Sequence, residues 1–104
     1  MTWLPIIKYT GYWDVPRRIF LERNGVELAL DCPFDEGMDD YADHYQVYQL
    51  PTGTIDRLQR RELTVDEAVG AGIAIGSVRV ADVRFDETKR RLIDDSSVAD
   101  LLAP

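Results

Sequence analysis

The sequence predicts a mainly β fold, a small antiparallel sheet of about five strands curled into a partly open barrel or roll with short helical pieces. Three observations predict it. The chain has 104 residues, 45% hydrophobic and 30% charged, which suits one globular domain over residues 1–104. Short runs rich in β-branched and aromatic residues recur between turn signals. A flat sheet of this size would expose its apolar face, so we expect the sheet to curl.

The strongest local signal is a hairpin at Asn24-Gly25, where both residues accept the positive φ angles of a type I′ turn. A two-residue turn fixes the register from Arg23 opposite Val26 to Arg17 opposite Cys32. Period-2 alternation selects the same register, because it gathers apolar side chains on one face. The inward pairs include Leu21 with Leu28 and Ile19 with Leu30, and the outer face carries Phe20 with Ala29.

Two further strands flank this hairpin. The first is Ile6 to Trp13, which ends at the break Asp14-Val15-Pro16. The second is Tyr45 to Leu50, whose two alternating sets of apolar residues compete for the core face. The register of this strand therefore stays open at the level of the sequence.

The second half of the chain predicts short helices and a second hairpin. Thr64 and Glu67 have the spacing of a capping box, and the helix that follows should end near Gly70. The alternation in Val78 to Phe85 slips at Ala81-Asp82, which indicates a β-bulge. We expect Arg91 to Asp94 to return against that strand. One or two helical turns should follow over Ser97 to Leu102.

Charge and composition limit the classes of partner that the chain can bind. With a net charge of -7, the chain should repel nucleic-acid phosphates and anionic lipid surfaces, which favours a basic protein partner over either. No apolar run approaches the roughly 20 residues of a membrane-spanning helix, and no signal peptide is recognisable. Cys32 is the single cysteine, so we expect no internal disulfide and a cytoplasmic setting.

The most unusual stretch is acidic. Between Arg23 and Arg57 there are eight acidic residues and no lysine or arginine, concentrated in a predicted loop after Cys32. Acidic residues beside tyrosines are typical of docking surfaces, although such a loop can also be merely solvated. We predict a protein-interaction or accessory module rather than an enzyme. The candidate binding residues are Asp35, Glu36, Asp39, Asp40, Tyr41, Asp43 and Tyr45.

The alternative is a metal-dependent hydrolase or metal-binding protein centred on Asp39, Asp40, Asp43 and His44, because clustered carboxylates and an imidazole are metal ligands. Their spacing does not reproduce an EF-hand loop, and the metal stays undefined. A Cys32–His44 pair would need hydrogen-bonding reach to support catalysis, so no catalytic residue is assigned. No phosphate-binding motif is present, and no cofactor is predicted.

The sequence also leaves a homodimer open. Tyr12 and Phe20 fall on the outward side of the first strands, where an aromatic patch would suit a partner or a second copy. Exposed edge strands favour the same outcome.

Overall fold

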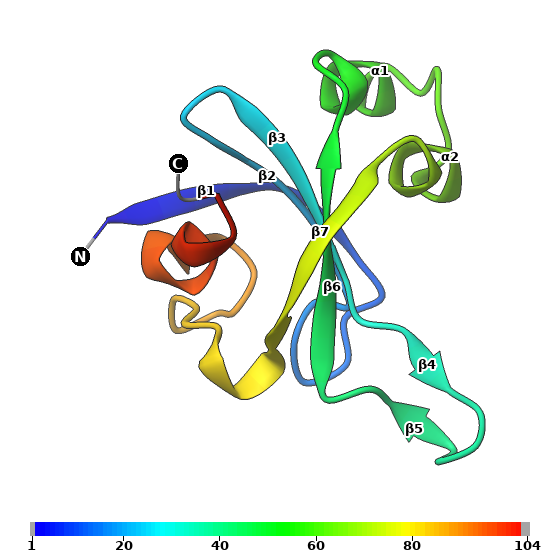
Figure 1. Ribbon diagram of the computed structural model, residues 1–104, viewed down its shortest axis with the longest axis vertical. Helices are drawn as coiled ribbons and strands as arrows, with labels where there is room; N and C mark the ends of the chain where they lie inside the picture. Colours follow the sequence, from blue (N-terminus) through cyan, green and yellow to red (C-terminus); the bar gives the residue numbers. More distant parts are fainter. Residues whose placement is uncertain (1, 103–104) are drawn as a thin grey trace.

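A six-stranded antiparallel sheet organises the computed structural model, which describes residues 2–102 (Figure 1). Its strand order is β7-β6-β3-β2-β1-β8, and the sheet does not close on itself. The mainly β prediction is confirmed, with one strand more in this sheet than expected. The strands are β1 (Trp3–Thr10), β2 (Arg18–Arg23), β3 (Val26–Asp31), β6 (His44–Leu50), β7 (Ile73–Arg79) and β8 (Leu92–Asp94).

The β2–β3 hairpin has the predicted register. Its pairs run from Arg23 opposite Val26 to Arg18 opposite Asp31, and the Cys32 amide donates to the Arg17 carbonyl at 2.7 Å. The turn residues Asn24 and Gly25 have φ angles of 52° and 81°, the left-handed values that a type I′ turn requires. The turn residues and the alternation of apolar side chains therefore predicted the same register, and the structure has that register.

Apolar side chains are buried on both faces of the sheet. The larger core lies on one face, where strand residues pack with the chain that follows β7, including Val83 and Val98. The three short 3-10 turns of that segment are η1 (Val80–Asp82), η2 (Asp95–Ser97) and η3 (Ala99–Leu102). The strand residues of this core include Ile19, Leu21, Leu28, Leu30, Tyr45, Val47 and Ile93, and Cys32 joins them just after β3.

The second core lies under two short helices, α1 (Thr54–Gln59) and α2 (Val65–Gly70). Phe20 packs here and is fully buried, so the expected exposed patch of Tyr12 and Phe20 does not form. The pairing of Phe20 with Ala29 on this face was predicted correctly. The sequence analysis did not predict that the helices would cover this face. Other members of this core are Ala29, Leu50, Ile55, Leu58 and Ala68.

The two helices begin differently. The capping box at α2 is confirmed, since the Thr64 hydroxyl accepts from the Glu67 amide at 3.1 Å and the Glu67 carboxylate accepts from the Thr64 amide at 3.0 Å. The hydrogen bond from the Thr64 amide to the carboxylate lowers the pKa of Glu67. Helix α1 is capped from the sheet instead: the Glu27 carboxylate of β3 accepts from the amides of Gly53 at 2.5 Å and Ile55 at 2.7 Å. A buried acid therefore fixes α1 against β3.

The last strand departs from expectation. Leu92–Asp94 is a strand, but it pairs mainly with β1 and meets the preceding chain in a single Phe85–Ile93 bridge. The predicted bulge at Ala81-Asp82 is a 3-10 turn, and the irregularity lies earlier, where β7 pairs with β6. Within residues 2–102, no helix has the length and apolar character needed to cross a lipid bilayer.

Candidate docking arm

The predicted acidic loop folds as a second small hairpin, which we call the acidic arm and define as residues Pro33 to Asp43. Strands β4 (Phe34–Asp35) and β5 (Asp40–Tyr41) pair antiparallel, and the Ala42 amide donates to the Pro33 carbonyl at 2.8 Å. The arm projects from the end of the main sheet between β3 and β6 (Figure 1). Most of its residues are exposed, whereas Tyr41 packs against the larger core.

Local hydrogen bonds shape the turn of the arm. The Asp35 Oδ1 atom accepts from the amides of Gly37 at 2.9 Å and Met38 at 3.3 Å, which is a typical use of an aspartate in a turn. Asp39 has a φ of 53°, a left-handed value that aspartate tolerates better than most residues. The acidic residues thus build the hairpin turn as well as charging it.

The structure brings most of the predicted binding residues together. Asp35, Glu36, Asp39, Asp40 and Asp43 are all exposed along the arm, and Tyr41 is half-buried at its base. Two apolar side chains that the sequence analysis did not select join them, because Phe34 is 51% exposed and Met38 72% exposed. Their position within the acidic run is the sequence signal that could have identified them.

Tyr45 does not join this surface. Its side chain is fully buried in the larger core, and its hydroxyl donates to the Pro16 carbonyl at 2.7 Å. Burial raises the pKa of Tyr45, and the nearby Cys32 adds to the effect more than Arg17 opposes it. Tyr45 and Val47 point into one core and Leu50 into the other. Both alternating sets of β6 residues therefore contribute to a core, one on each face of the sheet.

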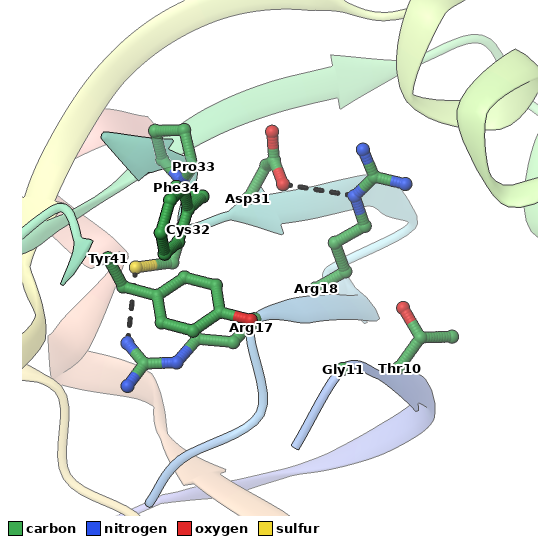
Figure 2. Close-up of a pocket in the computed structure, with 9 residues that line it drawn as sticks. All are labelled: Thr10, Gly11, Arg17, Arg18, Asp31, Cys32, Pro33, Phe34 and Tyr41. Carbon is green, nitrogen blue, oxygen red and sulfur yellow. Dashed lines mark hydrogen bonds and ion pairs between the residues drawn. The ribbon is translucent and has the colours of Figure 1, made fainter. Parts of the chain in front are cut away.

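Arg17 clamps the arm to the sheet (Figure 2). Its guanidinium lies over the Tyr41 ring, 4.3 Å from the ring centroid, a cation–π arrangement. Tyr41 in turn packs edge-on against Phe34 at a centroid distance of 5.3 Å. The two strands of the arm and the main sheet are therefore joined through one aromatic pair and one cation.

The same guanidinium reaches two polar groups below the arm. Its Nη1 donates to the Cys32 Sγ at 3.3 Å, and its Nη2 donates to the Trp13 carbonyl at 2.7 Å. The Cys32 thiol donates to the Ala42 carbonyl at 3.2 Å, at the end of the arm. The buried Nε of Arg17 has no hydrogen-bond partner within residues 2–102. Arg17 and Cys32 thus contact Tyr41 and Ala42 near the end of the arm.

A cavity of about 400 Å³ opens at the base of the arm (Figure 2). Arg18 lies in its wall and pairs with Asp31 at 3.1 Å and with Asp66 at 2.5 Å. Desolvation would lower the pKa of Arg18, but both carboxylates outweigh it and the pKa is raised. The other lining residues are Thr10, Gly11, Arg17, Cys32, Pro33, Phe34 and Tyr41.

The residues of the metal alternative are not preassembled. The His44 Nδ1 atom lies 3.3 Å from an Asp43 oxygen, but within residues 2–102 no group of three or more histidine, cysteine, aspartate or glutamate side chains is placed to hold a metal ion. Neither protein-family models, nor curated proteins, nor solved structures gave a match to this chain.

Proposed function

We propose that this protein is an interaction module, and that its acidic arm binds a basic segment of a partner protein. The observation that carries the proposal is a projecting hairpin whose five carboxylates are exposed while its base is clamped to the sheet. A merely solvated loop needs no such clamp. We place the module in the cytoplasm, because its lone thiol, Cys32, is free and buried.

Charge supports a basic partner. Residues 33–43 contain five acids and no lysine or arginine, so their fields add rather than cancel. At physiological salt such fields reach about 8 Å, which is enough to steer a basic segment to the arm and to set its orientation. Binding should therefore weaken as the salt concentration rises.

Apolar contact supplements the charge. Met38 and Phe34 are exposed on the same hairpin as the acids, and large apolar side chains are enriched in binding surfaces. Because Arg17 and Tyr41 fix the base, the arm is ordered before a partner arrives, and less conformational entropy is lost on binding. A partner with a basic and partly apolar segment fits this combination.

The test compares two triple variants that change the net charge equally. The first carries Asp39→Asn, Asp40→Asn and Asp43→Asn in the arm; the matched control carries Asp82→Asn, Glu87→Gln and Asp100→Asn at exposed positions outside it. Proteins captured from native lysate are identified by mass spectrometry, and their affinity is then measured with purified components. Thermal unfolding checks that both variants fold.

We expect the arm variant to bind the captured partner at least about tenfold more weakly than the wild type, equivalent to about 1.4 kcal/mol, while the control changes little. Equal losses in the two variants would mean that only net charge matters. A partner held equally by all three proteins would place the binding surface elsewhere. Either result would refute the arm as the docking site.

A further inference from the structure

The two edges of the main sheet differ. The β8 edge is covered by the preceding chain, since the Asp86 amide donates to the Leu92 carbonyl at 3.1 Å and the Asp94 amide donates to the Arg84 carbonyl at 2.9 Å. The Asp86 carboxylate accepts from the Leu92 amide at 3.0 Å and holds the covering loop in place. At the other edge, the only strand that pairs with β7 within residues 2–102 is β6.

Strand β7 carries one of the usual protections of an edge, an irregularity where the register of its pairing with β6 shifts. Natural edge strands are commonly short, or carry lysines, prolines or inward-pointing charges that prevent a further strand from pairing. The seven residues Ile73–Arg79 contain no lysine or proline, and Arg79 is their single charge. Ile73 is 74% exposed. Apart from the irregularity, none of these features blocks pairing along the described β7 edge.

The first half of β7 borders an apolar hollow. A cavity of about 240 Å³ lies there, lined by Gln49, Leu50, Pro51, Ala71, Ile73 and Ile75. A strand laid along β7 would place alternate side chains over this hollow, because residues two apart point to the same side of a sheet. Apolar side chains suit that end.

The far end of β7 leads to the acidic arm. The Val80 amide donates to the Asp43 carbonyl at 2.9 Å, and a cavity of about 430 Å³ at this corner is lined by residues of both segments. Its charged walls carry the carboxylates of Asp14, Asp40 and Asp43. They also carry the guanidinium of Arg79 and that of Arg17, which already donates to Cys32 and Trp13. Basic side chains suit this end.

We propose that the β7 edge binds an extended segment of the partner as a seventh, antiparallel strand, with a basic amino-terminal half and an alternating apolar carboxyl-terminal half. Every neighbouring pair in the main sheet is antiparallel, so the added segment would begin beside Arg79 and end beside Ile73. Its first residues would then meet the acidic arm. This inference rests on the proposed function and adds the binding mode and polarity of the partner.

A second copy of the chain fits the edge less well. Pairing two β7 strands antiparallel would set the acidic corner of one copy against the apolar hollow of the other, and each copy carries a net charge of -7. The complementarity that a basic-to-apolar segment offers at both ends of β7 is absent in that arrangement. We therefore favour a partner segment as the occupant.

The probe is a synthetic peptide, Lys-Lys-Arg-Thr-Val-Thr-Val-Thr-Val, and its control is the same sequence reversed. Amide hydrogen exchange of the full chain, followed by NMR, reports which protein amides the peptide protects. We expect at least a tenfold slowing at alternate amides of Ile73–Arg79 with the probe and a weaker effect with the reversed peptide. In an antiparallel pair, every second peptide residue exchanges backbone hydrogen bonds with β7. N-methylating those residues should abolish the effect, and N-methylating the residues between them should not.

Two variants separate this inference from the proposed function. The exposed site of Ile73 allows Ile73→Lys to fold, and this variant should lose the protection of β7 while still binding basic peptides at the arm. The triple arm variant should bind the probe more weakly yet keep the exchange pattern on β7.

Protection confined to the arm would overturn the added strand and leave the arm proposal standing. No response in either region would overturn both. Protection of β7 that appears without peptide and grows with protein concentration would show a second copy on this edge, and would overturn the partner segment as its occupant.

Discussion

Two hairpins follow one another in this chain, and they differ in how far they are buried. The β2–β3 hairpin is buried on both faces, with Leu21 and Leu28 in one core and Phe20 in the other. The acidic arm that comes next is largely exposed, and Tyr41 at its base packs against the larger core. Since both have backbone ladders, the difference between them lies in what covers their side chains.

The acids of the two hairpins show the same contrast. The carboxylates of Glu27 and Asp35 each accept hydrogen bonds from two backbone amides. Glu27 is 8% exposed and joins β3 to α1, whereas Asp35 is exposed and joins only its own turn. Identical chemistry should therefore contribute to global stability in one hairpin and to local order in the other.

The largest expected effect comes from removing a phenylalanine ring from each hairpin. Phe20→Ala should reduce the free energy of unfolding by about 3 to 5 kcal/mol, because it empties the second core under α1 and α2. Phe34→Ala should cost less than about 1 kcal/mol, since half of that ring is already exposed. Urea unfolding of both variants measures the difference, and similar losses would contradict the assignment of the arm as a separate, exposed element.

A smaller contrast is expected for the two carboxylates. Glu27→Ala should destabilise the protein by about 2 to 3 kcal/mol, because the amides of Gly53 and Ile55 lose a charged acceptor in a buried site. Asp35→Ala should change global stability by less than about 0.5 kcal/mol, although amide exchange at Gly37 and Met38 should accelerate. Equal effects on unfolding would refute the contrast.

The smallest effect concerns Tyr45. Because burial raises the pKa of its phenol, the folded protein keeps this proton at pH values where the unfolded chain, with an ordinary pKa of about 10, releases it. This contribution to stability is therefore complete below about pH 10 and declines as the pH rises above it. Tyr45→Phe should cost about 1 to 2 kcal/mol at pH 7, since the Pro16 carbonyl loses its donor.

Unfolding measured from pH 8 to 11 checks this expectation. The wild type should lose stability more steeply than Tyr45→Phe above pH 10, because the variant has no phenol to ionise at this site. Parallel pH profiles would show that Tyr45 titrates normally in the folded protein. That result would contradict its place in the core.

The elements predicted best were those specified by neighbouring residues. Asn24-Gly25 predicted the register of all six residue pairs between β2 and β3, and Thr64 with Glu67 located the start of α2. Features that depend on distant chain segments were missed. Phe20 was expected to be exposed because nothing in the sequence of β2 indicates that α1 and α2 cover it. These helices lie about 35 to 50 residues later in the chain.

The candidate site shows the same limit. The acids of the arm were identified from charge clustering alone, and all of them are exposed. Tyr45 was grouped with them because it lies nearby in sequence, yet one strand residue after His44 it already points into the larger core. Proximity along a chain does not distinguish the two sides of a strand when both sides are covered.

The pairing of β1 with β8 has a consequence for how the protein folds. Trp3 pairs with Asp94, and the Ile6 amide donates to the Arg91 carbonyl at 2.8 Å, so these contacts join segments from opposite ends of the sequence. Bringing such segments together requires closing a very long loop before any contact rewards it. The β2–β3 hairpin closes across only two residues, so we expect it to form early. We therefore expect β8 to dock late, so that the rate of folding is set by the chain's most distant contacts.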